Sequence, residues 1–109
     1  MTTAAELFAR IGEKITVKSE LLTSIGAVYK FVLDGPGGGT YVVDLKQALR
    51  VTEGDGPAGC TVLMSAADFV DLFEGRANGQ ALFFGGKLKV EGDMGVAMQL
   101  QSVMAKLRG

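Results

Sequence analysis

Residues 86–107, which read GKLKVEGDMGVAMQLQSVMAKL, constrain the fold more than any other segment. The first part alternates charged residues with Leu88 and Val90, which is the period of a half-buried strand. Asp93 is a good helix N-cap, so we expect a helix to begin directly after it. Basic residues near the end of the segment suit the negative end of a helix dipole. The sequence therefore predicts a short strand followed by a helix.

That predicted helix is apolar over an unusually wide arc. At about 100° per residue its apolar side chains spread over roughly 220°, whereas a surface helix needs a stripe only a little wider than ~100°. Gln101 falls inside the apolar arc, where an amide would lack water. Two interpretations remain open at this point. Further protein or an oligomer partner covers the helix, or the helix has a core on one flank and an apolar ligand on the other.

Composition limits the class of protein. The 109 residues are enough for one domain with a real core, and 48% are hydrophobic against 21% charged, as in a globular protein. The net charge of −1, without a basic cluster, argues against a nucleic-acid partner. No apolar run approaches the ~18–20 residues of a membrane span and no leader opens the chain, so we expect a cytoplasmic protein.

The usual residues of catalysis and metal binding are scarce. The chain has no His, and Cys60 is its single cysteine, so a cysteine nucleophile would lack the usual base. Asp34 and Asp44 are not paired with any base or nucleophile, which makes a hydrolase or transferase the weakest hypothesis. The glycine-rich loop at residues 35–39 joins two predicted strands and so does not fit a phosphate-binding loop. We expect no catalytic residue, no metal and no cofactor.

The remaining periodicity predicts an α+β fold, with a five-stranded, largely antiparallel sheet and helices packed on one side of it. Two neighbouring residues stand out, because Phe83 and Phe84 cannot both point into one core from so short a helix. One of them is predicted to face something else. The predicted helices are residues 4 to 14 or 18, a short turn capped by Ser19, a helix after Ser65 that stops at Gly75, residues 79–84, and the final helix after Asp93. The predicted strands are residues 27–33, 40–46, 49–53, 60–64 and 87–91.

An ordered set of sequence pieces resembles one known family. The pieces are residues 26–31 (GAVYKF), 41–46 (YVVDLK), 61–65 (TVLMS) and 86–101 (GKLKVEGDMGVAMQLQ). With this spacing, the chain resembles the sterol carrier protein type 2 family over nearly its whole length. The resemblance implies one lipid-binding domain over residues 1–109, an apolar tunnel within the α+β fold, and a non-catalytic, stand-alone protein. It also implies that the partner is a fatty acid, fatty acyl-CoA, phospholipid or sterol-like molecule.

The hypothesis that follows is a lipid-binding or lipid-transfer protein whose tunnel is lined by flexible and aromatic side chains. The alternative is an accessory module that docks through its C-terminal helix on a lipid-metabolising enzyme or on a second copy of itself. Transient membrane contact and a homodimer are further expectations that the sequence leaves open. The candidate ligand-binding residues are Phe8, Ile11, Ile15, Phe69, Phe73, Leu82, Phe83, Phe84, Met94, Ala97, Met98 and Met104, with Gln80 and Gln101 as the polar groups for a head group.

Overall fold

The computed structural model describes residues 3–18, 20, 22 and 25–108, and only the backbone of residues 101 and 108. Five strands form one sheet: β1 (Val28–Asp34), β2 (Gly39–Asp44), β3 (Arg50–Glu53), β4 (Cys60–Ser65) and β5 (Lys89–Gly92). The helices are α1 (Ala4–Val17), α3 (Ala66–Phe73), α4 (Gly79–Phe84), α5 (Met94–Met98) and α6 (Leu100–Arg108). The predicted turn at Ser19 lies outside the described residues.

The sheet has the strand order β3-β2-β1-β4-β5. Every neighbouring pair is antiparallel except β1 and β4, which run parallel. The chain must therefore pass from the β3 edge across the sheet before β4 begins, and residues 54–59 make that crossing. Gly54 N–H donates to the Thr40 carbonyl (2.7 Å) and Gly59 N–H to the Val28 carbonyl (3.1 Å), which fixes the two ends of the crossing. The predicted α+β class and the largely antiparallel sheet are confirmed.

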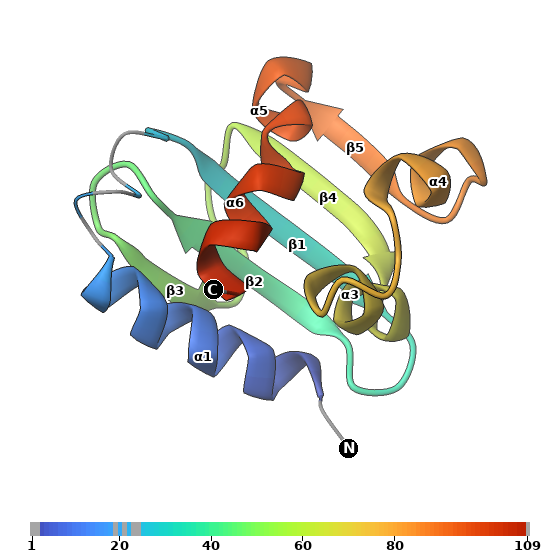
Figure 1. Ribbon diagram of the computed structural model, residues 1–109, viewed down its shortest axis with the longest axis horizontal. Helices are drawn as coiled ribbons and strands as arrows, with labels where there is room; N and C mark the ends of the chain where they lie inside the picture. Colours follow the sequence, from blue (N-terminus) through green and yellow to red (C-terminus); the bar gives the residue numbers. More distant parts are fainter. Residues whose placement is uncertain (1–2, 19, 21, 23–24, 109) are drawn as a thin grey trace.

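The inner face of the sheet and three helices enclose the core. Figure 1 shows α1, α3 and α6 lying over one face of the sheet. Aromatic rings fill the space between these layers, because alternate residues of each strand point inward. The Phe8 ring stacks on Tyr41, with centroids 3.9 Å apart, and on Phe69 at 4.8 Å. Phe31 packs edge-on against Phe69 at 5.3 Å, which closes one continuous aromatic cluster.

Local capping residues explain where the helices begin and end. Thr3 Oγ1 accepts from the Glu6 N–H (3.2 Å) at the start of α1, and Ser65 Oγ accepts from the Asp68 N–H (3.0 Å) at the start of α3. Gly75, with φ of +84°, ends α3 in the left-handed conformation that glycine tolerates. These predicted ends are confirmed.

The final helix differs from the prediction. It was expected to be continuous from Met94 to Leu107, but it is broken at Gln99 into α5 and α6. Asp93 caps α5 as predicted, since its Oδ1 accepts from the Gly95 N–H (2.8 Å) and the Val96 N–H (3.2 Å). Beyond the break, α6 buries Leu100, Val103, Met104 and Leu107, whereas no residue of α5 is fully buried.

Candidate functional site

A half-open groove of about 580 Å³ lies between α4, α5 and α6, beside strand β5. Its volume is within the ~300–1,000 Å³ range typical of sites for small organic molecules. Figure 1 shows α4 and α5 near opposite ends of β5, with α6 running back over the sheet. The lining residues are Leu72, Asn78, Gly79, Gln80, Phe83, Phe84, Leu88, Val90, Met94, Ala97, Met98, Leu100 and Met104.

The groove gathers the exposed apolar side chains of the protein. Among the described residues, the large exposed hydrophobics are Val17, Phe83, Phe84, Met94 and Met98, and all but Val17 line the groove. Phe84 is 83% exposed and Met98 is 81% exposed. A contiguous exposed apolar patch on a soluble domain usually marks a place where something binds. The surface thus points to an apolar ligand or partner at this groove.

Helix α4 forms one wall of the groove, because none of its side chains is fully buried in the core. Asn78 Oδ1 accepts from the Gln80 N–H (2.8 Å) and the Ala81 N–H (3.2 Å), which starts the helix. No residue of α4 is fully buried, and Leu82 alone packs on the core as a partly buried side chain. The two phenylalanine rings meet with centroids 5.7 Å apart at an angle of 71°. Both rings line the groove, so the prediction that one of them faces something other than the core holds, and the structure places the second ring there as well.

The opposite wall, α5, is held to the sheet by a buried tyrosine. The Tyr29 hydroxyl donates to the Val96 carbonyl at 2.7 Å, and the Gln99 N–H donates to the same carbonyl at 3.2 Å. A side chain that bonds into the carbonyl ladder is a common cause of a helix kink, so Tyr29 accounts for the break at Gln99. Burial raises the pKa of Tyr29 to about 12, with a smaller contribution from Cys60. The hydroxyl therefore stays protonated and keeps donating at neutral pH.

The structure divides the predicted ligand-binding residues into groups. Those in the groove are Gln80, Phe83, Phe84, Met94, Ala97, Met98 and Met104. Those in the packed core, away from the groove, are Phe8, Ile11, Ile15 and Phe69, while Leu82 packs partly buried against that core without lining the groove. Phe73 lines a second, smaller pocket, and the side chain of Gln101 lies outside the described part of the chain. Whether any of these residues contacts a ligand stays a prediction.

Sequence reasoning missed the groove residues contributed by the sheet edge and by the ends of α3 and α6. Leu72, Leu88, Val90 and Leu100 line the groove in addition to their contacts with the core. The alternation of Leu88 and Val90 was visible in the sequence, but it predicts only that one side of the strand is covered. Which element covers that side depends on how α4 and α5 pack against the sheet. Contacts between residues far apart in the sequence determine this packing.

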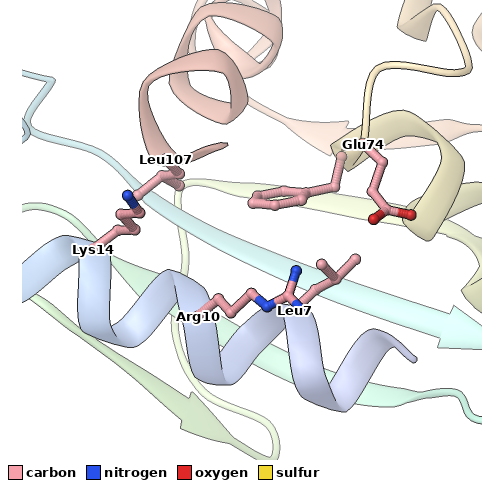
Figure 2. Close-up of a pocket in the computed structure, with 6 residues that line it drawn as sticks. Leu7, Arg10, Lys14, Glu74 and Leu107 are labelled. Atoms are coloured by element: carbon pink, nitrogen blue, oxygen red, sulfur yellow. The ribbon is translucent and has the colours of Figure 1, made fainter. Parts of the chain in front are cut away.

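The second pocket, of about 190 Å³, lies between α1, α3 and α6 and has a different chemical character. Figure 2 shows Arg10 and Lys14 reaching from α1, Glu74 at the end of α3, and Leu107 from α6. Glu74 forms an ion pair with Arg76 at 2.8 Å. A cavity of this size is below the ~300 Å³ at which small-molecule sites usually begin. The larger groove is therefore the better candidate for a functional site.

The described residues offer little for other kinds of site. Within them, no helix is both long enough and apolar enough to span a bilayer. In the same part of the chain, no cluster of three or more His, Cys, Asp or Glu side chains is placed to hold a metal ion. Burial raises the pKa of the Cys60 thiol, which keeps it in its unreactive protonated form at neutral pH.

Comparison with proteins of known sequence identifies relatives of this chain. The chain is 41% identical to human sterol carrier protein 2 over 103 residues, which cover 89% of this chain and 19% of the human protein. It is 35% identical to mouse hydroxysteroid dehydrogenase-like protein 2 over 97 residues, covering 86% of this chain and 20% of the mouse protein. The chain thus spans about a fifth of the length of the curated relatives that it matches.

Solved structures show the same fold. Sterol carrier protein 2 from Yarrowia lipolytica, in its apo form, superposes with a TM-score of 0.85 at 27% identity, over 97% of this chain and 92% of the yeast chain. Sterol carrier protein 2 from Aedes aegypti, in complex with palmitate, gives a TM-score of 0.77 at 21% identity, over 97% and 98% of the two chains. The model of the SCP-2 sterol transfer family matches residues 6–105. The chain therefore belongs to the SCP-2 sterol transfer family.

Proposed function

We propose that the chain binds one lipid molecule non-covalently in the groove between α4, α5 and α6, and carries or presents it without catalysing a reaction. The observation that carries this proposal is the concentration of exposed apolar side chains in a single groove of lipid-sized volume. Membership in a lipid-transfer family supports it, as does a structure of the same fold solved with a C16 fatty acid. The proposed ligands are fatty acids, fatty acyl-CoA, phospholipids and sterol-like molecules.

Such binding requires no reactive group, because burial of the acyl chain supplies the free energy of binding. Burial of an acyl chain contributes roughly 0.8 kcal/mol per methylene, so twelve methylenes would give about 10 kcal/mol. Association costs several kcal/mol of lost translational and rotational freedom, which still leaves useful affinity. Methionine suits this role, because its flexible thioether adapts to ligands of different shape. Met94, Met98 and Met104 supply that adaptable surface on one side of the groove.

The alternative proposal is a docking module that uses its C-terminal helix. The wide apolar arc that suggested it is largely accounted for within the chain, since Leu100, Val103, Met104 and Leu107 are buried. The apolar side chains of α5 that remain exposed, Met94 and Met98, line the groove. This distribution favours a ligand over an enzyme or a second copy as the occupant.

Displacement of a fluorescent lipid tests the proposal. Met98→Glu places a charge at the groove, and we expect it to weaken lipid binding at least tenfold, which corresponds to about 1.4 kcal/mol. Val17→Glu is the matched control, because Val17 is 80% exposed on α1 and Met98 is 81% exposed. The control should bind like the wild type. Equal loss in both variants, or no lipid binding by the wild type, would contradict the proposal.

A further inference from the structure

Strand β5 forms one edge of the sheet and has a hydrogen-bonding side without a strand next to it. Within the described part of the chain it pairs with β4 alone. The Asp93 N–H donates to the Gly59 carbonyl at 2.9 Å, and hydrogen-bonded pairs recur at every second residue of an antiparallel ladder. Lys89 and Glu91 therefore bond to β4, whereas the N–H and C=O groups of Val90 point outward. Such an edge can pair with a further strand.

The charges around Val90 have opposite signs on its two sides. Residues 87–93 read KLKVEGD, so two lysines precede Val90 and two acids follow it at the same distances. Val90 lines the groove on the inner face of the sheet, and alternate residues of a strand point to opposite faces. The exposed side chains of Lys89 and Glu91 therefore lie on the outer face. A segment with this pattern is complementary to a reversed copy of itself.

We propose that two copies of this chain associate edge to edge through β5, in an antiparallel pair centred on Val90 and related by a two-fold axis. The Val90 N–H of each copy donates to the Val90 carbonyl of the other. Lys89 of each copy then lies opposite Glu91 of the other, in a non-hydrogen-bonded pair whose Cα atoms are only about 4.5 Å apart. Lys87 lies opposite Asp93 in the same register. Opposite charges in facing positions stabilise a strand pair.

The same charges specify this register. The outward-pointing backbone groups allow the centre of the pair to move only by two residues at a time. A centre at Leu88 would place lysine opposite lysine, and a centre at Gly92 would place acid opposite acid, which destabilises a ladder in both cases. The Leu88 N–H is in addition occupied, since it donates to the Leu82 carbonyl at 3.1 Å. The centre at Val90 is therefore favoured.

The opposite edge of the sheet, β3, lacks this pattern. Helix α1 packs against it, as Figure 1 shows. The Gly54 N–H donates to the Thr40 carbonyl at 2.7 Å, so Val51 is the residue of β3 that points outward. A pair centred on Val51 would place Arg50 opposite Thr52, without a match of charge. Of the two edges, β5 is the one that complements itself.

The arrangement also brings two helices together. Figure 1 shows α4 and α5 near opposite ends of β5, so antiparallel pairing places α4 of one copy beside α5 of the other. Phe84 on α4 and Met98 on α5 are highly exposed, and contact between these helices would remove part of that apolar surface from water. The second copy approaches along the strand edge and does not occupy the groove. The inference therefore goes beyond the proposed function and does not depend on it.

Charge reversal tests the pairing by sedimentation equilibrium. We expect the wild type to show a monomer–dimer equilibrium that shifts toward monomer at high salt. Lys89→Glu and Glu91→Lys each place like charges opposite one another at two positions of the symmetric dimer, so each should weaken association at least tenfold. Lys46→Glu is the matched control, because Lys46 is equally exposed but lies between β2 and β3. This control should associate like the wild type.

Combination of the two reversals decides whether these side chains face one another. An equimolar mixture of Lys89→Glu and Glu91→Lys should form a heterodimer, and the double variant should recover the homodimer, since opposite charges meet again in both. All the substituted side chains are exposed, so each variant should keep the Tm of the wild type. A wild type that stays monomeric up to about 1 mM, the weak end of specific association, would overturn the inference. So would a mixture that stays monomeric, or an equal loss in Lys46→Glu and Lys89→Glu.

Discussion

Replacement of Tyr29 by phenylalanine removes one hydroxyl and tests how the groove wall is held. Tyr29 is 1% exposed, and its hydroxyl donates to the Val96 carbonyl at 2.7 Å, just before the break between α5 and α6. Losing this hydrogen bond costs about 0.5–1.5 kcal/mol, because the Val96 carbonyl keeps the Gln99 N–H as a partner. For a domain of this size, each kcal/mol lowers Tm by roughly 4–8 °C. We therefore expect Tyr29→Phe to unfold at a visibly lower temperature and urea concentration than the wild type.

The same variant has a distinct pH signature. The pKa of Tyr29 is raised from 10.0 to about 12 in the folded protein. Between these values the unfolded state releases the phenolic proton and the folded state keeps it, so rising pH favours unfolding. The contribution of Tyr29 to the free energy of unfolding is fully present below pH 10 and is lost between pH 10 and about 12. The total loss over this range is roughly 3 kcal/mol. Tyr29→Phe should lack this part of the alkaline loss.

Urea unfolding of the wild type and the variant at several pH values from 7 to 12 measures both effects. The difference between the two curves isolates Tyr29, because Tyr41, whose pKa is also raised by burial, is present in both proteins. Lipid uptake should fall in Tyr29→Phe, since α5 has lost its bond to the sheet. Equal stability of the two proteins within about 0.5 kcal/mol at pH 7, together with identical alkaline curves, would refute the role given to this hydrogen bond.

Three further predictions concern the core, a cap and a tight backbone contact. Phe69→Ala empties the centre of the aromatic cluster and should cost about 3–5 kcal/mol in urea unfolding, because Phe69 is fully buried; a cost below about 1 kcal/mol would contradict that packing. Asn78→Ala removes the cap of α4 and should cost about 1 kcal/mol by the same measurement, whereas Asn78→Ser should recover most of it. Gly92→Ala should lower Tm clearly, since Gly92 has φ of +100° and an added Cβ would collide with the Gly59 carbonyl; an unchanged Tm would show that the contact can relax.

Local signals in the sequence were enough to predict the individual elements. Thr3, Ser65, Asn78 and Asp93 each precede a helix, and each is a side-chain cap in the structure. These caps act within three residues of the helix start, so a short stretch of sequence contains the whole interaction. The strand limits follow from the same local alternation and differ by at most two residues from the expected ones.

Long-range contacts account for what the sequence did not predict. The break at Gln99 depends on Tyr29, which is 67 residues away from Val96 in the chain. The parallel pairing of β1 with β4 depends on the route of residues 54–59 over the sheet, which has no local signature. The division of predicted apolar residues between core and groove has the same cause. Phe8 and Phe84 are chemically alike, yet one stacks on Tyr41 while the other is 83% exposed.

The most direct test of the central claim is the position of a bound lipid along the chain. A photoactivatable hexadecanol with a diazirine in its chain would be crosslinked to the chain of residues 1–109, and the labelled peptides would be identified by mass spectrometry. We expect the label on residues 79–98, with Phe84 or Met98 among the modified sites, and competition by unlabelled hexadecanol. Label confined to α1, or label that unlabelled lipid does not displace, would contradict a lipid-binding groove between α4, α5 and α6.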